Sequence, residues 1–312
     1  MSRKILKFEY FYCNFLTFIR KPYCFIPARL HLEYLVSRMS SNVTSCERLL
    51  QLSGFEERKN DVVYAPPKNI TQPSRVVVFF PGDVQDYIEN MESHRDNKHH
   101  KQWNLEDTAL KLQKKFPDEH ILVVKPARMD FKTFSCFQNF VNSSDMGVPS
   151  HCSDHNGLRH LSCLLESVSK VSKTNLSLLD ITLIGFSKGC VVLNQFLHEF
   201  HQFASVKNEE MLSFIRKIRD MYWLDGGHSG GKHTWVNDKE ILRTVVSLGI
   251  NIHVHVTPYQ IGDDRRPWIK KEEKTFSDIL IKYGCNIERV VHFESVPPSI
   301  FTHFDVINVF KK

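Results

Sequence analysis

The chain has 312 residues, of which 42% are hydrophobic and 24% are charged. This composition is typical of a globular protein with a sizeable core and argues against disordered and fibrous classes. The net charge of +6 comes mainly from the first 40 residues, which hold seven Lys or Arg and two Glu, whereas the rest carries 34 basic and 33 acidic side chains. Because the body is nearly neutral, a basic groove for nucleic acid is not expected.

The first 40 residues predict a targeting leader. In MSRKILKFEYFYCNFLTFIRK, basic residues flank an aromatic-rich stretch with few acids, as in a mitochondrial transit peptide. Glu9 and Asn14 interrupt the apolar run, which disfavours a secretory signal peptide. A signal peptide, a membrane-surface helix and a wrongly assigned start remain alternatives. We expect residues 1–40 to direct the protein to mitochondria, in the matrix, ahead of a single domain at 41–312.

Short apolar runs alternate with longer amphipathic segments from residue 75 onward. The predicted strands cover 75–80, 120–127, 181–186, 221–225, 251–258 and 289–294. The predicted helices cover 104–116, 157–171, 188–203, 238–249, 268–284 and a last segment after Ile300. This order predicts an α/β fold with a doubly wound, mostly parallel sheet and helices on both faces. No run reaches the ~18 apolar residues that span a bilayer, so no transmembrane segment is expected.

The predicted strand at 181–186 ends in a G-x-S-x-G motif centred on Ser187. A helix-forming run follows it, as a nucleophile elbow requires, because the small flanking residues Gly185 and Gly189 let the backbone turn sharply and expose the hydroxyl. Ser187 is therefore the candidate nucleophile. The alternative is a glycine-bracketed turn between a strand and a helix, without chemistry.

A serine nucleophile needs a base to take its proton and a carboxylate to orient that base. In the chain order of this kind of fold the histidine comes last, and His303 in SIFTHFD is the candidate base; a solvent-facing histidine at a helix start is the alternative. For the acid, Asp263 in the loop after 251–258 is favoured. Asp225 at the end of the preceding strand is the second candidate, ahead of Asp264 or no acid.

FFPGDVQDY follows the strand at 75–80 and predicts an oxyanion hole. The loop after this strand must offer a backbone N–H beside the one that follows the nucleophile. Gly82 allows a close approach, which leaves Asp83 or Val84, together with Lys188, as the amide donors. A helix-capping turn is the alternative.

The glycine-rich GGHSGG segment predicts a loop that lines the pocket. Gly226, Gly227 and His228 belong to it, and His228 is a minor alternative base. HEFH (198–201) has one residue too few for the H-E-x-x-H zinc motif, and HCSDH (151–155) is more simply a polar loop. No metal and no cofactor are expected.

Four stretches together carry a family resemblance: FFPGDVQDY, LIGFSKGCVVLNQF, MYWLDGGHSGG with TWV, and HVTPYQ. They resemble the chromosome two open reading frame 69 family, which is itself similar to α/β-hydrolases. The resemblance implies a mitochondrial protein of α/β-hydrolase-like fold, linked to respiratory function and without an established substrate. By motif, Ser187 matches the elbow serine, Asp263 lies after HVTPYQ and His303 lies in the S-I-x-x-H-F segment. Vertebrate members have a longer polar insertion before the elbow strand.

These observations predict a serine hydrolase of the esterase or thioesterase kind that acts through an acyl-Ser187 intermediate. A small acyl or lipid-like substrate fits the neutral body better than nucleic acid does. The alternative is a catalytically silent hydrolase fold that serves as a binding or assembly partner of mitochondrial proteins, because one fold hosts many functions. The sequence identifies no protein partner.

Overall fold

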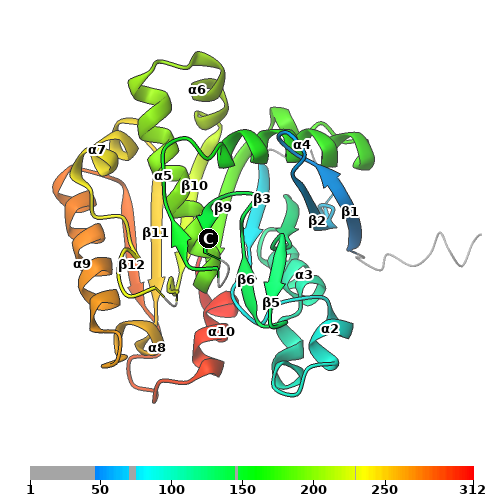
Figure 1. The fold of residues 1–312 in the computed structure, drawn as a ribbon, viewed down its shortest axis with the longest axis vertical. Coiled ribbons are helices and arrows are strands. Elements are labelled where there is room, and N and C mark those ends of the chain that lie inside the picture. The colour runs from blue at the N-terminus through cyan, green and yellow to red at the C-terminus, as the bar shows by residue number, and fades with distance from the viewer. Residues whose placement is uncertain (1–45, 70–74, 145–146, 229) are drawn as a thin grey trace, which may run out of the picture. The chain divides into compact units, whose positions relative to one another are not determined.

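The computed structural model describes residues 46–69, 75–144, 147–228 and 230–312, and the structural statements below concern those residues (Figure 1). The predicted leader, residues 1–40, lies outside them. Residues 44–312 form a compact unit by themselves. Within the described ranges, no helix is long and apolar enough to cross a membrane.

An eight-stranded sheet forms the centre of this unit. Its strands lie in the order β1 (Glu47–Ser53), β2 (Lys59–Ala65), β4 (His120–Val124), β3 (Arg75–Phe80), β9 (Asp180–Phe186), β10 (Ile218–Leu224), β11 (Asn251–Val256) and β12 (Ile287–Val291). β2 runs antiparallel to β1 and β4, and all other neighbouring pairs are parallel. Two hairpins stand apart from the sheet, β5 (Arg128–Asp130) with β6 (Phe134–Cys136) and β7 (Asn142–Ser143) with β8 (Pro149–Ser150).

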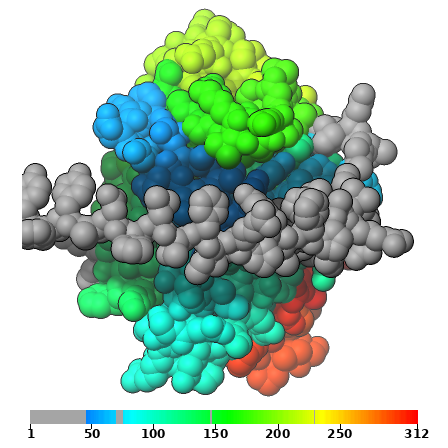
Figure 2. Space-filling model, turned by 90° about the vertical axis from the view of Figure 1, so that its right-hand side faces the viewer, coloured from blue at the N-terminus to red at the C-terminus, as the bar shows by residue number. Residues whose placement is uncertain are grey.

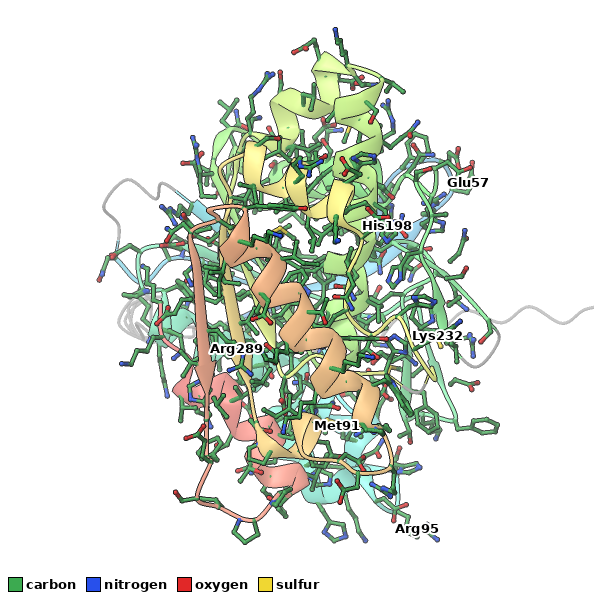
Figure 3. All side chains as sticks on the ribbon, turned by 90° about the vertical axis from the view of Figure 1, so that its left-hand side faces the viewer. Glu57, Met91, Arg95, His198, Lys232 and Arg289 are labelled. Carbon is green, nitrogen blue, oxygen red and sulfur yellow. The ribbon has the colours of Figure 1, made fainter. Side chains whose placement is uncertain are left out.

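Helices cover both faces of the sheet. One face carries α4 (Gly157–Ser172), α5 (Cys190–Ser205), α6 (Glu209–Ile215), α7 (Lys239–Ser247) and α9 (Pro267–Lys282). The other carries α3 (Leu105–Lys115) and α10 (Ile300–Val309). Two short helices, α2 (Ile88–Glu92) and α8 (Pro258–Ile261), lie in connecting segments. In Figure 3, α9 crosses in front of the sheet, and Arg289 of β12 is labelled. The Nε of Arg289 donates to the buried Glu273 of α9 at 2.7 Å.

The central strand β3 explains why two faces can be covered at once. Val76, Val78 and Phe80 belong to the core beneath α4 and α5, whereas Val77 and Phe79 belong to the core beneath α3 and α10. Successive side chains of a strand point to opposite faces, so a continuous apolar run is what a strand between two helix layers requires. The predicted α/β class, an α/β-hydrolase-like doubly wound and mostly parallel sheet, is confirmed.

The hairpin of β1 and β2 at one edge of the sheet was missed by the sequence analysis. In β1 only Leu49 and Leu52 are buried, and the register with β2 shifts between them. Neither a continuous apolar run nor a regular alternation therefore marks this strand. Figure 2 views this side of the molecule, with β1 and β2 in blue between α4 above and the α2–α3 region below.

The buried His160 of α4 ties the turn of this hairpin to the helix layer. Its Nδ1 accepts the Phe55 N–H at 3.1 Å, so Nε2 carries the proton and donates to Asn60 Oδ1 at 2.7 Å. Burial lowers the pKa of His160 to about 3. The imidazole is therefore neutral in the folded protein at every ordinary pH.

We expect this neutral imidazole to make the fold sensitive to acid. Because the pKa of His160 is about 3 when folded and about 6.5 when unfolded, only the unfolded chain binds a proton between those values, and stability falls as pH drops through that window. From pH 7 to pH 5 the loss from this residue is about 2 kcal/mol. In urea titrations at the two pH values, His160→Gln, which offers an acceptor and a donor but no titratable group, should lose less stability between pH 7 and pH 5 than wild type. The exposed His99→Gln is the control, and equal losses in wild type and His160→Gln would contradict the assignment.

Candidate active site

Ser187 occupies a strained turn between β9 and α5. It begins a short 3-10 helix, Ser187–Gly189, and its φ of 51° places it in the left-handed region that residues with a side chain rarely adopt. The two flanking glycines leave no room for a side chain: a Cβ on Gly189 would lie 2.0 Å from the Phe80 carbonyl oxygen, and one on Gly185 would lie 2.8 Å from Cys190 Cα. This is the geometry of a nucleophile elbow.

Close packing at the elbow predicts a strong effect of Gly189→Ala. The added methyl would collide with backbone that cannot move aside, so we expect a loss of about 3 kcal/mol or more in the free energy of unfolding. Gly231→Ala is the matched control, because nothing lies within 4 Å of a Cβ at that position. Equal urea midpoints for the two variants would contradict this account of the turn.

His303 lies in the first turn of α10, and its Nδ1 lies 2.6 Å from Asp225 Oδ2. Both side chains are buried. The same carboxylate accepts the Thr257 N–H on Oδ1 at 2.7 Å and the Thr257 hydroxyl on Oδ2 at 2.6 Å. Since a carboxylate facing Nδ1 requires a proton there, the His303 Nε2 keeps its lone pair and can accept a proton.

Asp263, the carboxylate favoured from the sequence, lies in the loop before α9 and forms no hydrogen bond with His303 in the described structure. Its oxygens accept from Arg265 Nε at 3.0 Å and Arg266 Nε at 2.8 Å, and these two hydrogen bonds lower its pKa. Asp225, the second candidate from the sequence, therefore contacts His303, and the favoured Asp263 does not. The physical reason is that β10 ends directly before Asp225 and lies beside β9, so its carboxyl end faces the elbow.

Ser187 and His303 line one pocket of about 290 Å³, together with residues of α8, α10 and the 82–84 loop. The described residues contain no hydrogen bond between the Ser187 hydroxyl and the His303 imidazole. Such contacts are often long without substrate and tighten when it binds. The His303 ring packs against the rings of Phe186 and Tyr259, each with a centroid 4.7 Å away. Its orientation is thus fixed by packing as well as by Asp225.

Gly82 brings the predicted oxyanion loop directly against the nucleophile. A Cβ on Gly82 would lie 2.8 Å from Ser187 Cβ, so only glycine fits. The Gly82 N–H donates to Gln85 Oε1 at 2.9 Å. The Val84 N–H donates to the Thr133 carbonyl at 2.6 Å. Neither of these two amides is free to bind a substrate oxygen.

Asp83 in this loop and Lys188 in the elbow remain as candidate amide donors. The Asp83 N–H has no acceptor within the described part of the chain, and Lys188 lies in the first turn of a helix, where N–H groups lack intrahelical partners. The Lys188 side chain is 2% exposed, and its Nζ lies 3.8 Å from Asp83 Oδ1. Burial raises the pKa of Asp83, while the Lys188 ammonium opposes that rise.

The glycine-rich loop after β10 reaches the pocket only in part. Gly227 and His228 line it, whereas Gly226 packs against Cys190 and Trp235. Burial lowers the pKa of His228. Its Nδ1 accepts the N–H of Gly230 at 2.9 Å and its Nε2 lies 3.3 Å from the His233 carbonyl, so both ring nitrogens are engaged and His228 is not a free base.

The sequence analysis did not single out several pocket or supporting residues, among them Gln85, Ser135, Tyr259 and Arg266. Ser135 holds the 82–84 loop, since its hydroxyl donates to the Gly82 carbonyl and its N–H to Asp83 Oδ1, each at 2.7 Å. It comes from the β5–β6 hairpin, in a segment that the sequence presents only as a polar loop. Tyr259 and Arg266 follow β11, where a search of strand ends could have found them.

No group of three or more His, Cys, Asp or Glu side chains among the described residues is placed to hold a metal ion. Glu199 of HEFH has a structural task instead. Its buried carboxylate accepts the N–H groups of Gly157 and Leu158 at 2.7 and 2.8 Å and so caps the start of α4. A carboxylate is favourable there because the N-terminus of a helix carries partial positive charge.

Comparison with known proteins adds a family to this geometry. The C2orf69 family model matches residues 48–178 and 168–286. This chain belongs to the C2orf69 family. The mitochondrial protein C2orf69 of Homo sapiens is 38% identical over 315 residues, covering 84% of this chain and 81% of that protein. Its homolog in Danio rerio is 36% identical over 303 residues and covers 88% of each chain.

Solved structures with a similar fold include esterases. A thermostable esterase aligns over 84% of this chain and 59% of its own, with 13% identity and a TM-score of 0.46. Esterase Est22 aligns over 90% of this chain and 82% of its own, with 12% identity and a TM-score of 0.44. At such low identity and scores, the chemistry of this family member has to be argued from its own residues.

Proposed function

We propose that the protein is a serine hydrolase that cleaves an ester or thioester through an acyl-Ser187 intermediate. The observation that carries the proposal is the pairing of a left-handed elbow serine with His303 in one pocket, where Asp225 is hydrogen-bonded to the imidazole. Strain at Ser187 and a buried carboxylate bound to a histidine are features that packing alone does not require.

In the first step the Ser187 hydroxyl attacks the carbonyl carbon of the substrate while His303 Nε2 takes its proton. The charge that develops on the carbonyl oxygen would be stabilised by the N–H groups of Asp83 and Lys188. The imidazolium then gives its proton to the leaving alcohol or thiol, and the acyl group remains on Ser187. Asp225 holds the ring and stabilises its positive charge throughout.

In the second step a water molecule attacks the acyl-Ser187 ester. His303 Nε2 takes a proton from the water and passes it to the serine oxygen as the acyl bond breaks, which releases a carboxylic acid and restores the free hydroxyl. The same two amides serve both steps. A pocket of about 290 Å³ lies at the lower end of ligand-site volumes, which favours a short acyl group over a long lipid chain.

We place this activity in mitochondria, with the matrix as the compartment. The relatives are named mitochondrial proteins, and the basic, aromatic-rich residues 1–40 have the composition of a transit peptide. A link to the respiratory chain rests on the family resemblance.

An activity-based probe tests the nucleophile directly. A fluorophosphonate should add covalently to Ser187 of the purified protein, seen as a mass shift on one peptide, and Ser187→Ala should remove the label. Ser213→Ala, at an exposed serine of α6, is the control and should label like wild type. Absence of label on folded wild-type protein would instead favour a silent fold that binds or assembles other mitochondrial proteins.

Two carboxylate variants test which acid orients the base. Asp225→Asn removes the charge beside His303 and should slow labelling and ester hydrolysis by at least about 100-fold. Asp263→Asn should stay within a few-fold of wild type with a neutral ester, because Asp263 is bound to arginines and not to the imidazole. The reverse ranking would restore Asp263 as the acid.

A further inference from the structure

Arg266 is a positively charged residue of the pocket, and its guanidinium can bind a ligand. Among the residues that line the pocket, the charged side chains are Asp83 and Arg266, beside the imidazoles of His228 and His303. Asp83 has the Lys188 ammonium 3.8 Å away and accepts the Ser135 N–H at 2.7 Å. Its negative charge is thus compensated by neighbours.

The guanidinium of Arg266 is held on one side and open on the other. Its Nε donates to Asp263 Oδ2 at 2.8 Å, and its backbone N–H donates to the Asp263 carbonyl at 2.9 Å. Its two terminal nitrogens have no hydrogen-bond partner among the described residues. An arginine fixed through Nε presents the paired N–H groups that match a carboxylate or phosphate.

Arg266 shares its carboxylate partner with a second arginine. Asp263 is shared with Arg265, so two guanidinium groups face one carboxylate. Asp264, the other acid of this loop, forms no ion pair within the described residues. The exposed fraction of the side chain is 26% for Arg266 and 88% for Arg265, and only Arg266 lines the pocket.

Tyr259 lines the same pocket as Arg266 and contacts the candidate base His303. Its ring stacks on the His303 ring at 4.7 Å, and its hydroxyl forms no hydrogen bond in the described structure. Burial raises the pKa of Tyr259, and the positive charge of Arg266 opposes the rise, as expected for close neighbours. A ligand group that reaches Arg266 would therefore meet a second donor beside the reacting centre.

We propose that Arg266, with Tyr259, binds an anionic group of the substrate. The substrate class is a small ester or thioester that carries a carboxylate or phosphate beyond the bond to be cleaved. This inference rests on the proposed hydrolase function and adds its specificity. Asp263, the carboxylate favoured from the sequence, is then a positioning residue: it holds Arg266 and takes no part in the proton transfer.

Two esters with acyl groups of six carbons test the proposal, 4-nitrophenyl hexanoate and mono-4-nitrophenyl adipate. They differ in a terminal methyl or carboxylate. We expect Arg266→Gln to lower the ratio of kcat/KM for the adipate ester over the hexanoate ester by about 10- to 100-fold, the range for one lost charge-assisted contact. Arg266→Lys, which keeps the positive charge, should give a ratio between those of Arg266→Gln and wild type. Arg265→Gln is the matched control, since it also removes an arginine bound to Asp263, and it should leave the ratio unchanged.

The outcomes separate this inference from the function beneath it. If fluorophosphonate labels Ser187 but wild type and Arg266→Gln give the same adipate-to-hexanoate ratio of kcat/KM, the proposed anion site is wrong. The proposed hydrolase function is then still supported. If no label appears, the hydrolase falls, and binding of adipate monoamide by calorimetry still tests the site: equal affinity in wild type and Arg266→Gln overturns it. Stronger protection of Ser187 by adipate monoamide than by phenyl phosphate indicates a carboxylate substrate, and the reverse indicates a phosphate.

Discussion

The buried carboxylate of Asp225 is the constraint on which the rest of the site depends. It joins the ends of two neighbouring strands, through Thr257, to the last helix, through His303. A fully buried carboxylate is stable only when its oxygens are hydrogen-bonded, and here both oxygens are. The position of α10 over the elbow is thus set by a polar contact that the apolar core around Phe304 and Ile307 reinforces.

A second set of polar contacts fixes the 82–84 loop, which lines another side of the pocket. The β5–β6 hairpin lies outside the main sheet, yet Ser135 and Thr133 bind the 82–84 loop through three hydrogen bonds. Gln85 holds the same loop from the side of α3, where its amide donates to Thr108 and to the Trp103 carbonyl. The Asp83 N–H lies between the bonded amides of Gly82 and Val84 and has no acceptor among the described residues.

The sequence predicts those features that depend on local pattern. The buried strands β3 and β9, the helix behind Asn104 and the elbow at Ser187 follow from apolar runs, capping and closely placed glycines. The carboxylate partner of His303 could not be identified in this way, because Asp225 and Asp263 both follow a strand and only the folded order of the sheet decides which faces the elbow. The edge hairpin of β1 and β2 escaped for a related reason. Five of the seven residues of β1 are exposed, and the register of β1 with β2 is irregular.

The left-handed backbone at Ser187 lowers the stability of the fold. A residue with a side chain pays about 1 kcal/mol in this region that glycine would not, so folding by itself favours glycine at the centre of the turn. The serine at this position therefore lowers the free energy of unfolding relative to glycine. A Ser187→Gly exchange would therefore relieve backbone strain and remove the hydroxyl from the turn.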